Sequence, residues 1–432
     1  MEAEASRAAV LDDLEWRGMI AYHTDLDALR TAMASGPVTF YGGFDPTHSS
    51  LHFGNLVLLV TMRRLQLAGH RPIGLVGGAT GLVGDPSGRT SERTLNEREV
   101  VEGWVDRIRS QVERYLSFEG DTAAIIVNNL NWTGAMSAID WLRDVGKHFP
   151  LGPMLAKESV SARMRAGGIS YTEFSYQVMQ ALDFLELYRR HGCTLQVGGS
   201  DQWGNLTAGV DLIRRVEGAS VHALATPLIT RPDGEKFGKS TGSTLYLDPA
   251  LTPPFAFYQW FLNTDDSVVG TYLRVFSFRS RAEIEALEAD AAARPEAREA
   301  QRALATEVTE LVHGTDAAAR AAEASRALFG DGDLRSLDAA TLEAAFADLP
   351  RAEITAANGA PMPSILDLLV ASGLSESRGQ ARRVLGEGGA YLNNARVADP
   401  AAVPTTSDLL AGRWLLLRRG KRNLAVAEVS SS

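Results

Sequence analysis

The sequence predicts an α/β protein in which a doubly wound parallel sheet is followed by an α-helical part and a small α+β part. Three observations support this prediction. Strand-like apolar runs alternate with amphipathic stretches up to about residue 248, they are absent up to about residue 346, and they return after a proline-rich stretch. With 432 residues the chain is too long for one ordinary core, so two or three domains are expected.

The first part begins with a predicted helix and continues with a buried strand at 38–44 (VTFYGGF), a turn, and a helix from about residue 50. Later apolar runs predict further strands, separated by amphipathic stretches such as 135–148, at 72–77, 124–127 and 195–198. Strands that alternate with helices form a Rossmann-like parallel sheet wound on both faces, which binds ligands at the carboxyl ends of its strands.

The second part, from 251 to about 346, is rich in Ala, Glu and Arg and predicts helices. Three prolines and an Asn-Gly pair then predict a linker, and the tail combines helix-like and strand-like segments. The predicted domains are a catalytic domain at 1–248, a helical domain at 249–349, a linker at 350–363 and a small domain at 364–432.

The composition limits the function classes. No run approaches the roughly 20 apolar residues of a membrane span, and the acidic start is unlike a signal peptide, so a cytoplasmic protein is expected. The single cysteine, Cys193, excludes an intramolecular disulfide and a multi-cysteine zinc site. The formal net charge of −10 argues against nonspecific nucleic-acid binding, but residues 364–432 hold nine Arg or Lys against six Asp or Glu. This tail can bind RNA.

Four strings in a fixed order carry a resemblance to a known family. They are HFGN at 52–55, FSYQVMQALDFLELY at 174–188, SDQWGNLTAG at 200–209 and KFGKS at 236–240. The first and last resemble the two signature motifs of a class I aminoacyl-tRNA synthetase. The combination resembles the bacterial-type tyrosyl-tRNA synthetases from about residue 11 to 429, and the tail resembles an RNA-binding module of a ribosomal small-subunit protein.

This resemblance implies a reaction that needs no protein nucleophile. The tyrosine carboxylate attacks the α-phosphorus of ATP, pyrophosphate leaves, and the tyrosyl group passes to the 3′ end of tRNA(Tyr). Catalysis then comes from positioning and from donors that meet developing charge. Thr47 and His52 lie where a strand turns into a helix and anions are favoured, so His52 is expected to act by hydrogen bonding. Lys236 and Lys239, in a glycine-rich loop, are expected to close over pyrophosphate.

The other nucleotide contacts follow from the same resemblance. Gly43, Asp45, Gly199 and Asp201 are expected at ATP, Asp201 at a ribose hydroxyl. The family usually has a second histidine where this chain has Asn55, whose amide can still donate. Mg²⁺ is expected to arrive with ATP, held by phosphates and water rather than by a dedicated protein site.

The amino-acid pocket is expected along one helix face, since Tyr176, Gln180 and Asp183 are spaced four and three residues apart. By resemblance Tyr176, Gln180 and Asp85 hold the tyrosine ammonium, and Gln202 lies on the carboxylate side. Tyr41 and Asp183 bind the phenolic hydroxyl. Phenylalanine would leave that pair desolvated and unpaired, so the pair is expected to set specificity.

The tail supplies the predicted contacts with the tRNA backbone, which are Arg382, Arg383, Arg418, Arg419, Lys421 and Arg422. A homodimer is expected from the family alone. Two other functions stay open at this point. A synthetase for tryptophan would have no use for the pair Tyr41 and Asp183, and an RNA-binding protein that has lost catalysis would have no reason to keep Thr47, His52 and both lysines.

Overall fold

A six-stranded sheet carries the first of two units into which the chain divides. The structure is a computed structural model. It describes residues 2–87, 96–229, 244–329, 332–347, 349–356, 362–420 and 423–431. The first unit comprises Met1–Leu251 with Asp265–Ala300, and the second comprises Thr252–Thr264 with Gln301–Ser432.

The strand order of the first sheet is β1-β6-β5-β2-β3-β4, and every pair is parallel except β1 with β6. The strands are β1 Tyr22–His23, β2 Thr39–Phe44, β3 Arg71–Val76, β4 Ile125–Asn128, β5 Cys193–Gly199 and β6 His222–Thr226. The four predicted strands are confirmed with small shifts at their ends, and so is the doubly wound α/β fold class. The two strands that were not predicted, β1 and β6, lie next to each other at one end of the sheet.

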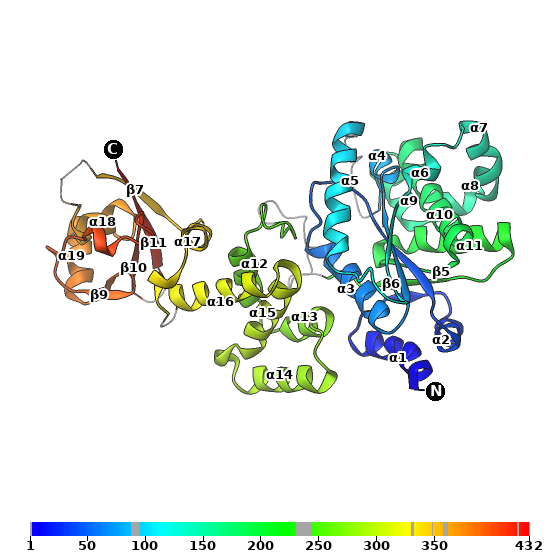
Figure 1. The fold of residues 1–432 in the computed structure, drawn as a ribbon. Helices are drawn as coiled ribbons and strands as arrows, with labels where there is room; N and C mark the ends of the chain where they lie inside the picture. The colour runs from blue at the N-terminus through cyan, green and yellow to red at the C-terminus, as the bar shows by residue number, and fades with distance from the viewer. Residues whose placement is uncertain are drawn as a thin grey trace. The chain divides into compact units, whose positions relative to one another are not determined.

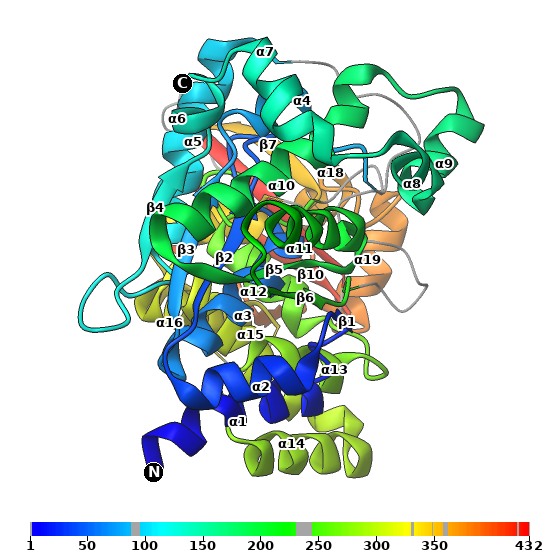
Figure 2. The same ribbon diagram turned by 90° about the vertical axis from the view of Figure 1, so that its right-hand side faces the viewer.

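Helices cover both faces of this sheet (Figures 1 and 2). On one face lie α3, Phe53–Leu67, and α5, Arg98–Glu113; on the other lie α10, Tyr171–His191, and α11, Trp203–Glu217. The remaining helices of the unit are α1 Glu2–Trp16, α2 Leu26–Ser35, α4 Thr80–Val83, α6 Leu130–Thr133, α7 Ala138–Asp140, α8 Leu151–Ala156, α9 Glu158–Ala166, α13 Val269–Phe276 and α14 Arg281–Ala293.

The central strand β2 is apolar on both faces, as a parallel strand between two helical layers should be, because neither face reaches water. Phe40, Tyr41 and Phe44 are buried. A Cβ at Gly42 would lie only 2.6 Å from the sulfur of Met62, so glycine allows α3 to lie directly against β2. The close packing brings the first turn of α3 next to the carboxyl end of β2.

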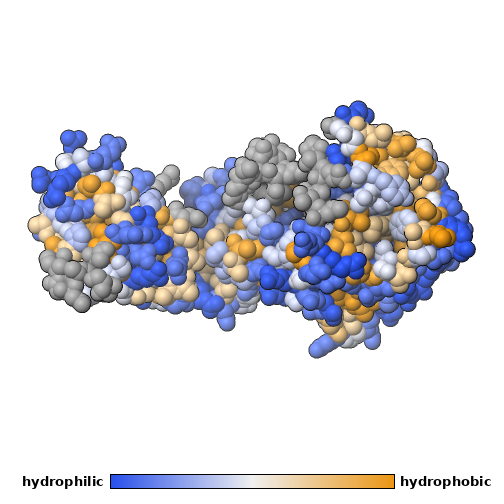
Figure 3. Space-filling view, turned by 90° about the horizontal axis from the view of Figure 1, so that it is seen from above, coloured by the Kyte–Doolittle hydropathy of each residue, from blue (hydrophilic) through white to orange (hydrophobic). Residues whose placement is uncertain are grey.

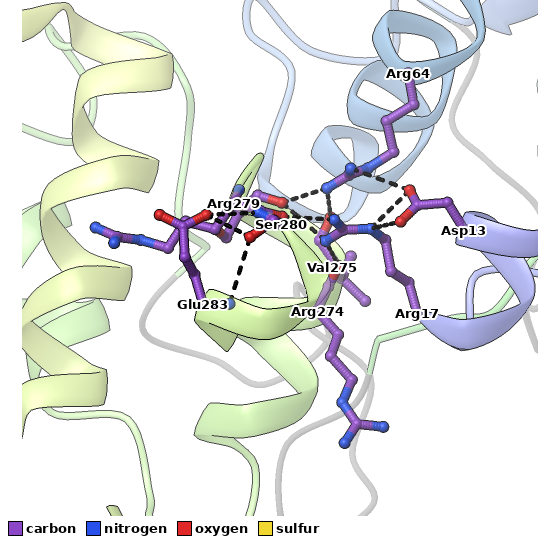
Figure 4. Close-up of polar contacts among 9 residues, drawn as sticks. Asp13, Arg17, Arg64, Arg274, Val275, Arg279, Ser280 and Glu283 are labelled. Atoms are coloured by element: carbon purple, nitrogen blue, oxygen red, sulfur yellow. Dashed lines mark hydrogen bonds and ion pairs between the residues drawn. The ribbon is translucent and has the colours of Figure 1, made fainter. Parts of the chain in front are cut away.

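Helix α13 belongs to the first unit because two arginines hold its carboxyl end (Figure 4). Arg17 donates to three backbone carbonyl oxygens, those of Arg274, Ser277 and Arg279, at 2.8, 3.0 and 2.8 Å. Arg64 of α3 donates to the Ser277 carbonyl, and Asp13 accepts from Arg17 at 2.8 Å. The last carbonyl groups of a helix lack partners within it and attract positive charge, so this end is satisfied by side chains. Burial, with Arg17 alongside, lowers the pKa of Arg64 to about 9, which keeps it charged at pH 7.

The second unit contains helices and a five-stranded sheet in the order β7-β11-β10-β8-β9. Its strands are β7 Arg351–Ala356, β8 Ala390–Leu392, β9 Ala395–Val397, β10 Trp414–Arg419 and β11 Asn423–Ser431. Its helices are α12 Pro254–Leu262, most of α15 Glu299–His313, α16 Thr315–Phe329, α17 Ala339–Phe346, α18 Ile365–Ala371 and α19 Arg378–Gly386. Among the described residues from 251 to 346 there is no strand.

Two features differ from the sequence-based division. The predicted linker at 350–363 begins with β7, which pairs in parallel with the last strand β11 from Arg351↔Val426 onward. Residues 265–300 belong to the first unit, although they lie within the predicted helical domain. Both differences arise from contacts with segments distant in the chain, which composition does not reveal.

Candidate active site

A cavity of about 370 Å³ opens at the carboxyl ends of β2 and β5. The chain winds from β2 outward through β3 and β4, and then from β5 outward through β6, so neighbouring β2 and β5 mark the point where the winding direction reverses. At such a point the loops after the two strands diverge and leave a crevice, which is where doubly wound sheets bind their ligands.

Every predicted tyrosine or ATP contact that the structure describes lines this cavity. These residues are Tyr41, Gly43, Asp45, Thr47, His52, Asn55, Asp85, Tyr176, Gln180, Asp183, Gly199, Asp201 and Gln202. They come from β2, the start of α3, the loop after α4, α10 and the segment after β5. The other two predicted catalytic residues, Lys236 and Lys239, lie outside the described residues.

The start of α3 forms one wall, and its first residues cap their own helix. His52 is the N-cap residue; its ring Nδ1 accepts the N–H of Gly54 at 3.1 Å, and its own N–H donates to Oδ1 of Asn55 at 3.0 Å. Burial lowers the pKa of His52. Because Nδ1 is an acceptor, the neutral ring carries its proton on Nε2 and can donate from that atom. The ring is therefore suited to hydrogen bonding and holds no positive charge at neutral pH.

Asp183 lies at the buried end of the cavity, where 1% of its surface is exposed. The indole N–H of Trp132 donates to Oδ1 at 2.8 Å, and the amide of Asn129 donates to Oδ2 at 2.9 Å. Burial raises the pKa of Asp183 to about 7, while these two donors pull the pKa in the opposite direction. Both oxygens thus face N–H groups and are arranged to act as acceptors.

The hydroxyl of Tyr41 lies close to the same end of the cavity and is buried with no hydrogen-bond partner among the described residues. Burial, followed by the charge of Asp183, raises the pKa of Tyr41 well above its ordinary value, so the hydroxyl is neutral. A buried hydroxyl without a partner is costly and rare in a folded protein. Because it lies in the cavity wall, this hydroxyl is available to form a hydrogen bond with a bound ligand.

A chain of hydrogen bonds connects this end with the middle of the cavity. The Asn129 amide also donates to the Thr80 hydroxyl at 3.0 Å, and Thr80 donates to Oδ1 of Asp45 at 2.6 Å. The Tyr176 hydroxyl donates to Oδ2 of Asp45 at 2.6 Å. Burial and the Asp45 carboxylate raise the pKa of Tyr176 well above its ordinary value. The side chains are consequently held in place before any ligand binds.

A further carboxylate, Asp85, lines the cavity beside the segment that follows β5. The Gln202 amide donates to its Oδ2 at 2.5 Å, and the Ser87 N–H donates to its Oδ1 at 2.9 Å. Asn205 in turn donates to Oε1 of Gln202 at 2.9 Å. Nearby, Oε1 of Gln180 is buried without a hydrogen-bond partner among the described residues. Carboxylates and an amide oxygen are the acceptors that an ammonium group requires.

At Gly199, which ends β5, an added Cβ would lie 2.7 Å from Oδ1 of Asp201. A side chain at position 199 would therefore displace the Asp201 carboxylate from its observed place in the cavity lining.

Sequence reasoning missed four residues that shape this site. Gln196, in β5, lines the cavity with Oε1 unpartnered among the described residues, and it pairs in register with Tyr41. Thr80 also lines the cavity, whereas Asn129 and Trp132 act on Asp183 from behind it. A glutamine inside the apolar run LQVGG and the pair of asparagines at 128 and 129, where β4 ends, were the available signals.

The predicted tRNA contacts lie in the second unit. Arg382 and Arg383 are exposed on α19. The guanidinium of Arg418 lies 4.1 Å from the ring centre of Tyr391, and that of Arg419 donates to the Leu374 carbonyl at 2.8 Å. Lys421 and Arg422 lie outside the described residues. The structure thus brings the small-molecule residues into one cavity, but it commits Arg419 to a structural contact.

Two general properties can be stated for the part of the chain that the structure describes. It contains no group of three or more His, Cys, Asp or Glu side chains arranged to hold a metal ion. It also contains no helix that is long and apolar enough to cross a membrane.

Comparison with known proteins identifies the family. A family model described as tRNA synthetases class I (W and Y) matches residues 33–330, and one described as the tyrosine–tRNA ligase SYY-like C-terminal domain matches 341–427. The tyrosine–tRNA ligase of Streptomyces coelicolor is 59% identical over 98% of this chain and 99% of its own, and that of Mycobacterium tuberculosis is 56% identical over 97% and 98%. A solved C-terminally truncated mitochondrial tyrosyl-tRNA synthetase of Aspergillus nidulans, 30% identical, matches 76% of this chain and 98% of its own with a TM-score of 0.68. The chain therefore belongs to the class I tRNA synthetases of the tryptophan and tyrosine group, and within it to the bacterial-type tyrosyl-tRNA synthetases.

Proposed function

We propose that the cavity at the ends of β2 and β5 joins tyrosine to ATP, and that each predicted residue acts there as the resemblance implies. As a member of its family the chain charges tRNA(Tyr) with tyrosine and uses ATP as a substrate. The observation that carries the residue assignments is the gathering of all thirteen described tyrosine and ATP candidates around one cavity. In this cavity the tyrosine carboxylate attacks the α-phosphorus of ATP and displaces pyrophosphate.

The phenol of tyrosine occupies the buried end. Its hydroxyl donates to Asp183, whose other donors already come from Trp132 and Asn129. The Tyr41 hydroxyl, which lacks a partner among the described residues, then gains one. Phenylalanine would fill the same space but leave both groups unpaired, which disfavours it by the cost of burying them. Tryptophan offers no hydroxyl for this pair.

The ammonium and carboxylate of tyrosine lie toward Asp85. Tyr176, Gln180 and Asp85 hold the ammonium, and Gln202, already bonded to Asp85, lies on the carboxylate side. The network that fixes Asp45 and Tyr176 supports this assignment, since a substrate that must present its carboxylate in one direction requires rigid partners.

ATP lies toward the start of α3. His52 donates from Nε2 to the phosphates, with Thr47 beside it, and Asn55 contributes its amide N–H₂ because its oxygen caps the helix. Gly43, Asp45, Gly199 and Asp201 complete the nucleotide contacts. Lys236 and Lys239 meet the charge that develops on the departing pyrophosphate, and Mg²⁺ accompanies ATP on its phosphates and on water.

The second unit binds tRNA(Tyr) through Arg382, Arg383, Arg418, Arg419, Lys421 and Arg422. The exposed positions of Arg382 and Arg383 support contacts with phosphates.

We keep the division into a catalytic segment at 1–248, a helical segment at 249–349 and an RNA-binding segment at 364–432, with β7 added to the last. Since tRNA charging takes place where ribosomes work, the enzyme is cytoplasmic.

The enzyme acts as a homodimer. Large apolar side chains are exposed between residues 139 and 171, and Figure 3 shows apolar residues on the face of the first unit that carries α6 to α9. The exposed residues are Ile139, Leu142, Leu151, Leu155, Met164 and Tyr171. An apolar surface of this kind is typical of an interface with a second copy.

Sedimentation at micromolar concentration tests the homodimer. Leu142→Asp should give monomer, whereas Leu67→Asp, on exposed apolar surface elsewhere, should not. A wild-type monomer would contradict the homodimer.

Amino-acid-dependent exchange of pyrophosphate into ATP tests the activation step. Tyrosine, phenylalanine and tryptophan are compared with wild-type enzyme, with Lys239→Ala and with the exposed Lys147→Ala as control. Exchange with tyrosine alone, weakened in Lys239→Ala only, is the expected result. Exchange with tryptophan would overturn the roles of Tyr41 and Asp183, and no exchange by folded protein would favour a binding function without catalysis.

A further inference from the structure

The backbone that brings His52 into the cavity is held from outside its own helix. Its two capping contacts, with Gly54 and Asn55, fix the ring relative to α3 only. The residues before it, 48–51, are contacted by α5 and by the described segment 244–248, neither of which supplies a predicted site residue.

Gln111 of α5 contacts the two residues that precede His52. Its side chain is buried, and its Oε1 accepts the N–H of Leu51 at 2.9 Å and faces the hydroxyl of Ser50 at 3.3 Å. A buried backbone N–H that loses its acceptor is expensive, so the peptide of Leu51 is bound to the position that Gln111 sets. This is the peptide group between Ser50 and Leu51, and Leu51 directly precedes His52.

The segment 244–248 holds the same residues from a second side. His52 pairs with Tyr246 in an antiparallel bridge, in which Phe53 donates to the Leu245 carbonyl at 2.8 Å and Leu247 donates to the Leu51 carbonyl at 2.9 Å. Both backbone groups of Leu51 are therefore engaged, its N–H by Gln111 and its carbonyl by Leu247. The first bond holds the peptide group between Ser50 and Leu51 and the second holds the one between Leu51 and His52, so neither group can rotate without breaking its bond.

His48, four residues before His52, is also contacted by both α5 and the segment 244–248, through stacked aromatic rings. The ring of His48 lies 4.6 Å from that of Tyr246 and 6.2 Å from that of Trp104, with interplanar angles of 22° and 24°. Trp104 and Gln111 are seven residues apart on α5 and thus lie on one face of that helix. We call Gln111 and Trp104 the α5 brace.

We propose that the α5 brace positions His52 for adenylation, with Gln111 as the principal positioning residue acting through Leu51. This inference rests on the proposed role of His52 at the phosphates of ATP. Catalysis by positioned donors is sensitive to displacements of about 1 Å, which can reduce the rate roughly a hundredfold. Loss of the Leu51 contact should therefore reduce the rate of adenylation while tyrosine, held by other elements, still binds.

The test is pyrophosphate exchange by Gln111→Met in the full chain, in wild-type and in His52→Ala backgrounds. Gln66→Met is the matched control, since Gln66 is a buried glutamine of α3 whose amide donates to the carbonyls of Ser117 and Thr122 at 2.7 and 2.9 Å, far from the cavity lining. Gln111→Met should lower kcat about tenfold in the wild-type background and leave the KM for tyrosine unchanged. In the His52→Ala background it should have no further effect, because coupled residues are not additive.

Each outcome separates the inference from the proposed function. If His52→Ala itself leaves exchange unchanged, the role of His52 fails. If His52→Ala lowers kcat but Gln111→Met does not, or does so equally in both backgrounds, the brace has no positioning role. A loss of kcat in Gln66→Met equal to that in Gln111→Met would also overturn it. If Gln111→Met does not fold, the exposed His48→Ala is measured instead. It should lower kcat by a smaller factor than is expected for Gln111→Met, and it should have no effect in the His52→Ala background.

Discussion

The buried end of the cavity and the arginines of the second unit use charge in opposite ways. At the cavity, Asp183 is almost fully buried and both of its oxygens have protein donors. On α19, Arg382 and Arg383 are exposed to solvent. A buried polar group depends on each partner, because water cannot replace a lost one, whereas an exposed charge is solvated and screened.

This difference determines how much a single substitution should matter. In the cavity, one altered atom leaves a donor or acceptor unpaired in a site of low dielectric constant. On the surface proposed to bind tRNA, several charges act in parallel and each contributes a small part. The four predictions below test this contrast, from the largest expected effect to the smallest.

Asp183→Asn should have the largest effect. The new amide would direct N–H groups at either Trp132 or Asn129, both of which are donors, so one contact becomes repulsive and the phenol loses its acceptor. We expect kcat/KM for tyrosine in pyrophosphate exchange to fall by about a hundredfold or more, from roughly 1–3 kcal/mol for each unpaired group. Asp211→Asn, at an exposed site on α11, is the control. A fall of less than threefold would show that Asp183 does not contact the substrate.

Tyr41→Phe should weaken tyrosine selection without weakening the fold. The hydroxyl has no partner among the described residues, so its removal costs the free protein no hydrogen bond. Tyrosine should lose about tenfold in kcat/KM, corresponding to roughly 1 kcal/mol for one hydrogen bond, and its preference over phenylalanine should shrink. The melting temperature should stay the same or rise. A lower melting temperature with unchanged selection would assign Tyr41 to the core alone.

Tyrosine binding should weaken on acidification, because the pKa of Asp183 in the folded protein is about 7. In the proposed binding mode the carboxylate accepts from the phenol, so the dissociation constant should rise roughly tenfold from pH 7.5 to pH 6. For folding the sign is opposite: this raised pKa favours the folded state below about pH 4, and that contribution is lost as the pH rises through about 7. Equilibrium binding and thermal unfolding across this range check both signs. Asp183→Asn should remove both dependences, and their persistence would assign them to another group.

The smallest effect is expected for the double substitution of Arg382 and Arg383 by alanine. The KM for tRNA(Tyr) should rise about threefold, and the salt dependence of tRNA binding should weaken by roughly one to two units of slope. Pyrophosphate exchange should be unchanged. Arg419→Ala should in addition lower the melting temperature, since it removes the hydrogen bond to the Leu374 carbonyl, whereas the double substitution of Arg382 and Arg383 should not. If replacing Arg382 and Arg383 reduced pyrophosphate exchange more than tRNA charging, these arginines would not act only as exposed tRNA contacts, and the contrast with the buried cavity residues would fail.

Local patterns in the sequence were sufficient for four of the six strands of the first sheet and for most of the cavity. Four strands, the helix that starts after residue 50 and the long helix α10 follow from apolar periodicity, which is a property of neighbouring residues. The resemblance to the bacterial-type tyrosyl-tRNA synthetases predicted the thirteen cavity residues, and the cavity lies at the carboxyl ends of parallel strands, where such a sheet binds ligands. The strand β7 was not predicted, since a short segment becomes a strand through its partner β11 some 75 residues later.

By itself, the sequence determined the fold class, the family and the residue types that meet the substrates, because these depend on local periodicity and on motifs of contiguous residues. Only the tertiary structure decided which groups support them. Trp132 and Asn129 hold Asp183, Gln111 holds Leu51, and Arg17 holds the end of α13. Such contacts join residues about 50 to 260 positions apart, and they arise because burial obliges each polar group to find a partner wherever the fold brings one.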